Sequence, residues 1–195
     1  MSRKDKIERR NYQCGGLEFR AGEGDNAQPI MTGYAALFDS ESEEMYGFRE
    51  KIAPGAFAKA VNGDVRALYN HDPNIILGRT KAKTLRLEED SRGLRVEIMP
   101  PDTQIARDLG ESMRRGDVDQ MSFGFRTIKD KWEETEGGTV RTLIEVELFD
   151  VSPVVFPAYA DTEIALRSLE AWRKEREPEI PDYENERRKL DLLAI

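Results

Sequence analysis

The run from Gln120 to Arg126 constrains the fold of this chain most strongly, because its residues alternate strictly in character. Every second position from Met121 to Phe125 is apolar, and the positions between them are polar or small. Successive side chains of a β-strand point to opposite faces of a sheet, so the pattern predicts a strand with one apolar face. Ser122 lies on the opposite face, and Gly124 on that face is expected to leave open space beside it.

Similar short runs recur along the chain, separated by segments rich in Gly, Pro, Asn and Asp. Such spacing predicts a mainly antiparallel β fold with flanking helices, an α+β protein whose strands close into a barrel or a sandwich. Strands are expected at 17–20, 30–38, 48–52, 65–69, 75–80, 84–88, 93–99, 120–133 and 139–149. Helices are expected at 53–61, at 102–115 and from 162 onward.

Size and charge limit the possible functions. The chain has 195 residues and a net charge of −8, which is unfavourable for a nucleic-acid-binding protein. No apolar run approaches the roughly 18 residues of a membrane span, and Met1 to Arg10 lacks the apolar region of a secretory signal. With Cys14 as the single cysteine, an intrachain disulfide and a cysteine-based zinc site are both excluded. We therefore expect an intracellular protein that binds neither nucleic acid nor a membrane.

Charge also divides the chain into three parts. Residues 1–15 are expected to be a flexible N-terminal arm, and residues 16–167 a single folded domain. Residues 168–195 are expected to form a charged helical or flexible tail, which Pro178 and Pro181 interrupt.

Three residues are candidates for catalysis. Ser122 is a small nucleophile on a rigid strand, although an ordinary strand serine fits the same pattern. His71 is the only histidine, and it follows a predicted strand in an Asn-His-Asp-Pro turn, where an exposed histidine is also common. Asp150 ends the strand that returns alongside the Ser122 strand, where it could equally cap a loop. Glu147, on the same strand with Glu145, is a competing acid.

Five blocks of the sequence carry a further signal. They are Gly33-Tyr34-Ala35 with Phe38; Ile52-Ala53-Pro54-Gly55-Ala56-Phe57; Leu68-Tyr69-Asn70-His71-Asp72 with Leu77-Gly78; Met121-Ser122-Phe123-Gly124-Phe125; and Asp150-Val151-Ser152-Pro153-Val154 with Pro157-Ala158-Tyr159. In this order, and over roughly residues 17 to 165, they resemble the prohead (capsid maturation) serine proteases of tailed bacteriophages. The second, third and fourth blocks together make the resemblance specific.

The resemblance implies a fold like that of the herpesvirus assemblins, a β-barrel surrounded by helices. It also implies that His71 is the general base and Ser122 the nucleophile. Herpesvirus enzymes use a second histidine as the third member, and this chain has none, so an acid must serve. Asp150 is the expected acid, with Glu147 as the alternative. Backbone N–H groups of residues 152–155 are candidate oxyanion-hole donors, except at Pro153.

The implied activity is that of a serine endopeptidase without metal or cofactor. Its expected partners are the major capsid protein, whose scaffolding segment it would cleave, and further copies of itself. It would act inside the assembling prohead in the host cytoplasm. A non-catalytic capsid scaffold or assembly protein with the same fold is the alternative. An esterase is less favoured, because the Gly-x-Ser-x-Gly motif is absent around Ser122.

Overall fold

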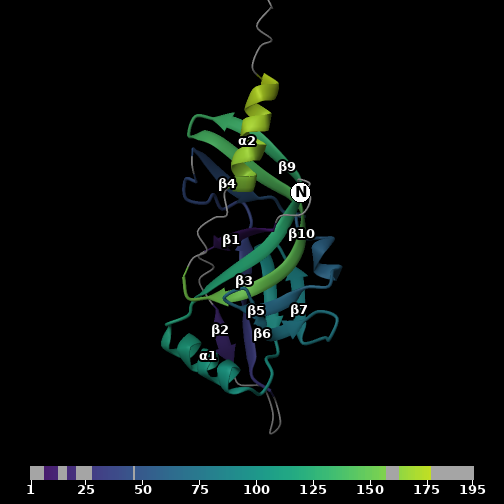
Figure 1. Ribbon diagram of the computed structural model, residues 1–195, viewed down its shortest axis with the longest axis vertical. Helices are drawn as coiled ribbons and strands as arrows, with labels where there is room; N and C mark the ends of the chain where they lie inside the picture. The colour runs from purple at the N-terminus through teal and green to yellow at the C-terminus, as the bar shows by residue number, and fades with distance from the viewer. Residues whose placement is uncertain (1–6, 13–16, 21–27, 46, 157–162, 177–195) are drawn as a thin grey trace, which may run out of the picture.

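The computed structural model describes residues 7–12, 17–20, 28–45, 47–156 and 163–176, which form two β-sheets and two α-helices (Figure 1). The larger sheet has the order β1-β9-β10-β5-β6, and β4 also pairs with β10. Its strands are β1 (Glu8–Tyr12), β4 (Phe48–Ile52), β5 (Arg66–Tyr69), β6 (Asp72–Arg79), β9 (Gln120–Thr135) and β10 (Gly138–Val154). The smaller sheet has the order β2-β3-β8-β7, with β2 (Glu18–Arg20), β3 (Ile30–Leu37), β7 (Leu85–Glu89) and β8 (Gly93–Ile98).

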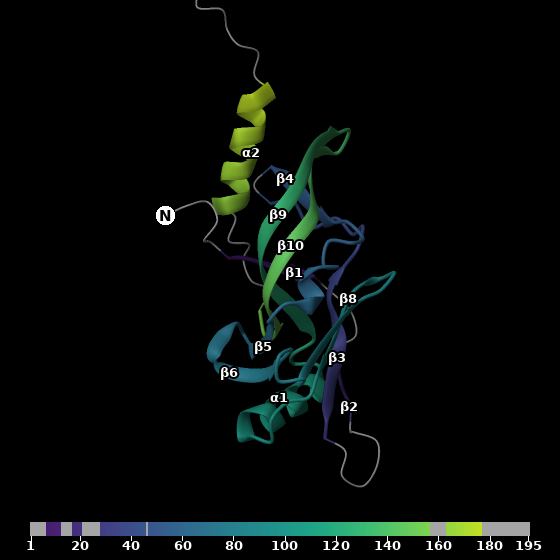
Figure 2. The ribbon, with the colours of Figure 1, turned by 90° about the vertical axis from the view of Figure 1, so that its right-hand side faces the viewer.

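The long β9–β10 hairpin forms the centre of the larger sheet, and β1, β4 and β5 pair with its two strands (Figure 2). Strand β10 pairs antiparallel with β9 along its length, but parallel with β4 near its start and with β5 near its end. All other pairings between named strands are antiparallel. The expected mainly antiparallel α+β fold is therefore confirmed, with β10 as a mixed central strand.

The hydrophobic core lies under the alternating run that dominates the sequence. Met121, Phe123 and Phe125 are buried, and the ring of Phe57 packs edge-on against Phe123 with centroids 5.6 Å apart. Strands of both sheets contribute to this core cluster, so β9 is buried on its apolar face as predicted. Ser122, on the other face, is also fully buried.

The expected helix over 53–61 is wrong. Within it the structure has only turns and the start of a 3₁₀ helix, Ala60–Asn62. Gly55 adopts a positive φ of 91°, which an α-helix does not allow. The carboxylate of Glu89 then accepts the N–H groups of Gly55 at 2.6 Å and Phe57 at 2.9 Å. Glu89, at the end of β7 in the smaller sheet, thus satisfies backbone donors of residues 53–61.

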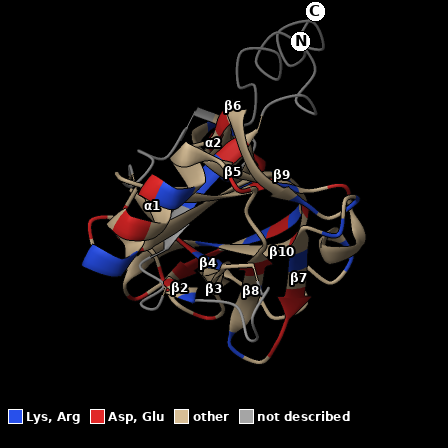
Figure 3. Ribbon diagram, turned by 90° about the horizontal axis from the view of Figure 1, so that it is seen from below, with Lys and Arg blue, Asp and Glu red and all other residues tan. Residues whose placement is uncertain are grey.

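The two helices cap opposite ends of the molecule (Figures 1 and 2). Helix α1 (Gln104–Arg115) begins at the N-cap Thr103, ends at Gly116 with φ 82°, and packs against β2. Acidic and basic residues are mixed along this helix (Figure 3). Its three arginines form ion pairs, Arg107 with Asp102, Arg114 with Glu111 and Arg115 with Asp117. No helix of the described residues is long and apolar enough to cross a membrane.

Helix α2 (Glu163–Arg176) runs through the expected boundary at residue 168. Ala165 and Leu169 are buried in a second small cluster with Phe48 and Trp132. The indole N–H of Trp132 also donates to Ser168 Oγ at 3.2 Å. This part of the expected tail therefore packs on the sheet, and the rest of it, residues 177–195, lies outside the described residues.

Residues 8–12 differ from the loose arm expected for residues 1–15. They form β1, which pairs antiparallel with β9 so that Arg10 lies opposite Phe123. Glu8 and Arg10 are buried, with side-chain exposures of 1% and 3%. A run of charges looks like a solvated arm in the sequence, but here each buried charge has an opposite partner, which is the condition for burying charge in a protein.

Candidate active site

The turn between β5 and β6 positions His71. Tyr69 pairs with Asp72, so Asn70 and His71 form a two-residue hairpin turn, and both have positive φ, 51° and 59°. Positive φ at both central residues is the mark of a type I′ turn, and it is uncommon outside glycine, although Asn and His adopt it more often than most residues. Asn70 ties the turn to the end of β10: its N–H donates to the Pro153 carbonyl at 3.0 Å, and its Oδ1 accepts the Val155 N–H at 3.0 Å. The backbone that carries the imidazole is thus held at two points.

Strand pairing brings the other candidates under that imidazole. Ser122 on β9 lies opposite Ser152 on β10, and Gly124 lies opposite Asp150. Because side chains two residues apart share a face, Ser122, Asp150 and Ser152 all point to the same side of the sheet. Strand β5, which leads into the His71 turn, pairs with β10 at Asp150. Segments distant in the sequence therefore converge on one patch.

The three candidate residues form a continuous hydrogen-bonded chain. His71 Nε2 lies 2.7 Å from Ser122 Oγ, and His71 Nδ1 lies 2.5 Å from Asp150 Oδ1. A carboxylate can only accept a hydrogen bond, so Nδ1 carries a proton; in the neutral imidazole, Nε2 then presents its lone pair to the serine. The side chains of His71 and Asp150 are only 8% and 9% exposed. This is the arrangement in which a neutral imidazole takes a proton from a hydroxyl.

Two further residues fix the position of Asp150. Ser152 Oγ donates to Asp150 Oδ1 at 2.7 Å. Gly124 lies directly beneath the carboxylate, where a Cβ added to the glycine would clash with Asp150 Oδ2. The expected open space beside Ser122 is therefore occupied, since the Asp150 side chain fills it. Glycine is needed at position 124 because any side chain would displace the acid.

Strand β1 closes the other side of the nucleophile. The hydroxyl of Ser122 also lies 3.0 Å from the carbonyl oxygen of Arg10 and donates to it. The same hydroxyl therefore contacts both the Arg10 carbonyl and His71 Nε2. Ser122 itself has no solvent-exposed surface.

The competing acids are engaged elsewhere. Glu147 forms an ion pair with Arg126, and Glu145 binds Lys59 Nζ at 2.9 Å. Of the acids considered from the sequence, Asp150 is the one that contacts His71. The N–H of Val155, a candidate oxyanion-hole donor, is bonded to Asn70. Among the described residues there is no group of three His, Cys, Asp or Glu that could hold a metal ion.

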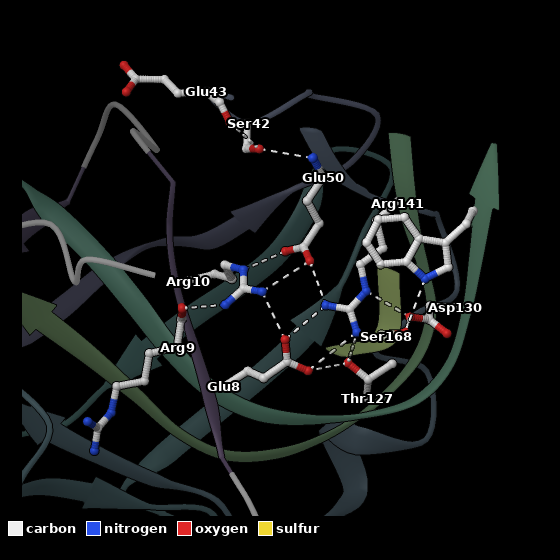
Figure 4. A network of polar contacts seen from close by, with 11 residues as sticks. Glu8, Arg9, Arg10, Ser42, Glu43, Glu50, Thr127, Asp130, Arg141 and Ser168 are labelled. Atoms are coloured by element: carbon white, nitrogen blue, oxygen red, sulfur yellow. Dashed lines mark hydrogen bonds and ion pairs between the residues drawn. The ribbon is translucent and has the colours of Figure 1, made fainter. Parts of the chain in front are cut away.

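A second buried polar cluster is shown in Figure 4; it lies on the face of β9 opposite Ser122, since Arg10 pairs with Phe123. Its core consists of two acids and two arginines: Glu8, Glu50, Arg10 and Arg141. Arg141 Nη1 lies 2.9 Å from carboxylate oxygens of both Glu8 and Glu50. Burial alone would raise the pKa of the Glu8 carboxyl, but the charges of Arg141 and Arg10, with hydrogen bonds from Arg141 and Thr127, outweigh it and hold that pKa below its usual range.

Sequence reasoning missed this charged cluster, the strand β1 and the contact of Ser152 with the acid. One signal was available for Ser152, because it stands two residues after Asp150 on a strand and so must share its face. Nothing comparable pointed to the cluster, whose members come from three separate segments of the chain.

Comparisons with known proteins identify relatives of this chain. The family model described as caudovirus prohead serine protease matches residues 16–175. The prohead protease of Enterobacteria phage HK97 is 29% identical over 167 residues, which cover 78% of this chain and 70% of that protein. The bacteriophage T4 capsid assembly protease has a similar fold, with a TM-score of 0.54 at 11% identity, over 76% of this chain and 97% of the T4 chain. This chain therefore belongs to the caudovirus prohead serine protease family.

Proposed function

We propose that this protein is a prohead maturation endopeptidase that cleaves the scaffolding part of the major capsid protein with a Ser122–His71–Asp150 triad. The observation that carries the proposal is the pair of contacts from His71, to Ser122 Oγ at 2.7 Å and to Asp150 Oδ1 at 2.5 Å. Triads are identified by geometry and role, so the chain order His, Ser, Asp is no obstacle. Membership of a protease family supports the same reaction class.

In the proposed reaction, Ser122 Oγ attacks the carbonyl carbon of the scissile peptide bond while its proton moves to His71 Nε2. The tetrahedral intermediate collapses, the C–N bond breaks, and the proton passes from Nε2 to the leaving amine. A water molecule then attacks the acyl-enzyme and gives one proton to Nε2. Ser122 recovers that proton as the new carboxylic acid leaves.

Asp150 stays ionised throughout the proposed cycle. It holds the imidazole in the tautomer with the proton on Nδ1, and it stabilises the imidazolium that forms when Nε2 takes up the second proton. Both roles depend on a fixed contact, which the short His71–Asp150 distance and the shielding from solvent provide. A carboxylate shielded from water interacts more strongly with that charge than an exposed one does.

The proposed partners follow from the same role. The substrate is the major capsid protein with its scaffolding segment, and the enzyme also cleaves copies of itself inside the prohead in the host cytoplasm. In this proposal the charged tail assigned to residues 168–195 docks on the scaffold and is a site of self-cleavage. Because α2 packs on the sheet through Leu169, we assign docking and self-cleavage to the residues after Arg176, which lie outside the described residues.

We further propose that the two sheets correspond to the β-barrel of the herpesvirus assemblins. The long curved hairpin β9–β10 and its mixed pairing with β4 and β5 support a partly closed sheet (Figure 2). Superposition of a crystal structure of this chain on an assemblin tests the idea, and strand orders that do not correspond would contradict it.

The test of function is co-expression with the major capsid protein of the same phage, followed by intact-mass spectrometry. The wild-type protein should yield a capsid protein shortened at one site, and the Ser122→Ala variant should leave it whole. Because Ser122→Ala keeps the protein present for assembly, it separates cleavage from any scaffolding effect. A whole capsid protein in both cultures, with soluble folded protein in each, would contradict the proposal.

A non-catalytic assembly protein is the second candidate, and one observation favours it. Ser122 has no exposed surface, and the Arg10 carbonyl accepts its hydroxyl, so the nucleophile is covered in this conformation. The co-expression experiment decides between the two, since an assembly protein would change the yield of proheads without shortening the capsid protein.

A further inference from the structure

Ser152 is a buried serine whose hydroxyl points at the acid of the proposed triad. It has no exposed surface, it lies opposite Ser122 in the β9–β10 pairing, and its Oγ is 2.7 Å from Asp150 Oδ1. We propose that Ser152 is a positioning residue of this active site, which fixes the plane of the Asp150 carboxylate toward His71. This inference rests on the proposed function, because it assigns Ser152 a role in the same reaction.

The Asp150 carboxylate needs a second contact because its side-chain torsion alone does not fix the direction of its oxygens. Rotation of an aspartate carboxylate about its last bond is broad, so a rotamer preference alone leaves the direction of its oxygens loosely defined. Here one oxygen, Oδ1, accepts two hydrogen bonds, from His71 Nδ1 and from Ser152 Oγ. Two donors at one oxygen define a plane that a single donor would not. The other oxygen rests over Gly124, where there is no room for a side chain.

Because Ser152 is buried, the loss of its hydroxyl should have a measurable effect on Asp150. Ser152 and Ser122 are both fully buried, so water cannot easily replace a lost donor at the carboxylate. Without the Ser152 hydroxyl, the Asp150 carboxylate can rotate, and the geometry of its hydrogen bond to His71 Nδ1 is no longer fixed. Errors of this kind in a catalytic group lower the rate of the chemical step rather than the binding of substrate. Ser152 should therefore affect kcat and leave KM unchanged.

The alternative is that Ser152 is simply a buried serine that satisfies its own hydroxyl on a nearby carboxylate. Under that alternative its loss would change stability but not the state of His71. The sequence offers a direct probe, because His71 is the only histidine among 195 residues. With histidine labelled by ¹⁵N, the resonance of the Nδ1–H proton reports on the His71–Asp150 contact without ambiguity. This readout does not require that any substrate be cleaved.

The experiment compares Ser152→Ala, Ser152→Thr and Ser168→Ala in the full chain. Ser168→Ala is the matched control, since Ser168 also bonds a carboxylate, that of Asp130, but belongs to another cluster. With a peptide spanning the cleavage site mapped on the capsid protein, Ser152→Ala should lower kcat roughly tenfold at unchanged KM. Its Nδ1–H resonance should move upfield and exchange faster with water. Ser152→Thr, which keeps the hydroxyl, should restore both, and Ser168→Ala should alter neither.

Three results separate this inference from the proposed function. A folded Ser152→Ala variant with wild-type kcat and an unmoved Nδ1–H resonance would overturn the role of Ser152. If Ser152→Ala does not fold, Ser152→Thr decides. A folded Ser152→Thr with the wild-type Nδ1–H resonance supports the positioning role of Ser152. A folded Ser152→Thr with a displaced resonance but wild-type kcat overturns that role. A wild-type protein that cleaves nothing contradicts the proposed function, and the resonance of the variants still decides whether Ser152 positions Asp150.

Discussion

Two buried polar clusters lie on opposite faces of β9, and they differ in what their protons can do. On one face, Glu8, Arg10, Glu50 and Arg141 form a set in which each acid contacts a guanidinium. On the other, His71 links a carboxylate to a hydroxyl. Arginine does not release its proton in proteins, so the first cluster can hold strands together but cannot carry proton transfer. Burial of polar groups therefore does not mark an active site, whereas an exchangeable proton beside a nucleophile does.

The sharpest contrast comes from removing the groups that react. Ser122→Ala and His71→Ala should each abolish cleavage of the capsid protein, because both groups take part in one proton transfer. The double variant should be no worse than either single one, since residues that act as a unit are not additive. Thermal unfolding should show that all three proteins remain folded. Substantial cleavage by either folded single variant would contradict the triad.

The next largest effect is expected at the acid. Asp150→Asn should lower kcat on the order of 10⁴-fold without reaching zero, since the acid orients and stabilises the imidazole rather than reacting. Glu147→Gln is the matched control on the same strand, and it should leave kcat close to wild type because Glu147 pairs with Arg126. Steady-state kinetics on the mapped peptide measure both. The reverse ranking would make Glu147 the orienting acid.

The charged cluster should respond in stability rather than in chemistry. Arg141→Met leaves the carboxylates of Glu8 and Glu50 with one guanidinium between them, and breaking a buried pair costs about 3–5 kcal/mol. The free energy of unfolding, measured in urea, should fall by that amount. The kcat of the molecules that remain folded should stay within a few-fold of wild type. A stable Arg141→Met protein with a large loss of kcat would show that this cluster serves catalysis.

Gly124→Ala adds one methyl group beneath the Asp150 carboxylate and so tests how closely that carboxylate must approach β9. The added Cβ would clash with Asp150 Oδ2, so the carboxylate must move away from His71. A misplacement of this size costs roughly 10²-fold in kcat. Gly137→Ala is the control, because its Cβ would meet nothing closer than 3.5 Å. Equal activity of the two variants would mean that the position of Asp150 does not limit the reaction.

The elements that sequence patterns predicted well are those with a regular period. The alternation from Gln120 to Arg126 gave the strand, its buried face and the side on which Ser122 lies. Helix α1 was predicted because its apolar residues recur at helical spacing and Gly116 ends it. These features are local, so a window of the sequence contains the information that decides them.

The features that were missed depend on contacts between distant segments. Residues 53–61 have the composition of a helix, but Glu89 from another strand binds their backbone N–H groups. In the sequence β1 looks like a charged arm, because its partners Glu50 and Arg141 lie far away along the chain. Ser122 and Asp150 were expected on neighbouring strands, but the contact of His71 with both of them depends on the pairing of β5 with β10. No window of sequence contains that pairing.

The most direct test of the triad is labelling with a fluorophosphonate, which reacts with a serine hydroxyl activated by a base. After digestion, mass spectrometry should find a single adduct, on the peptide that contains Ser122. The adduct should be absent from Ser122→Ala and form far more slowly in His71→Ala, since the imidazole is the base 2.7 Å from Oγ. An adduct on another serine, or labelling of His71→Ala at the wild-type rate, would contradict the assignment of Ser122 and His71 as nucleophile and base.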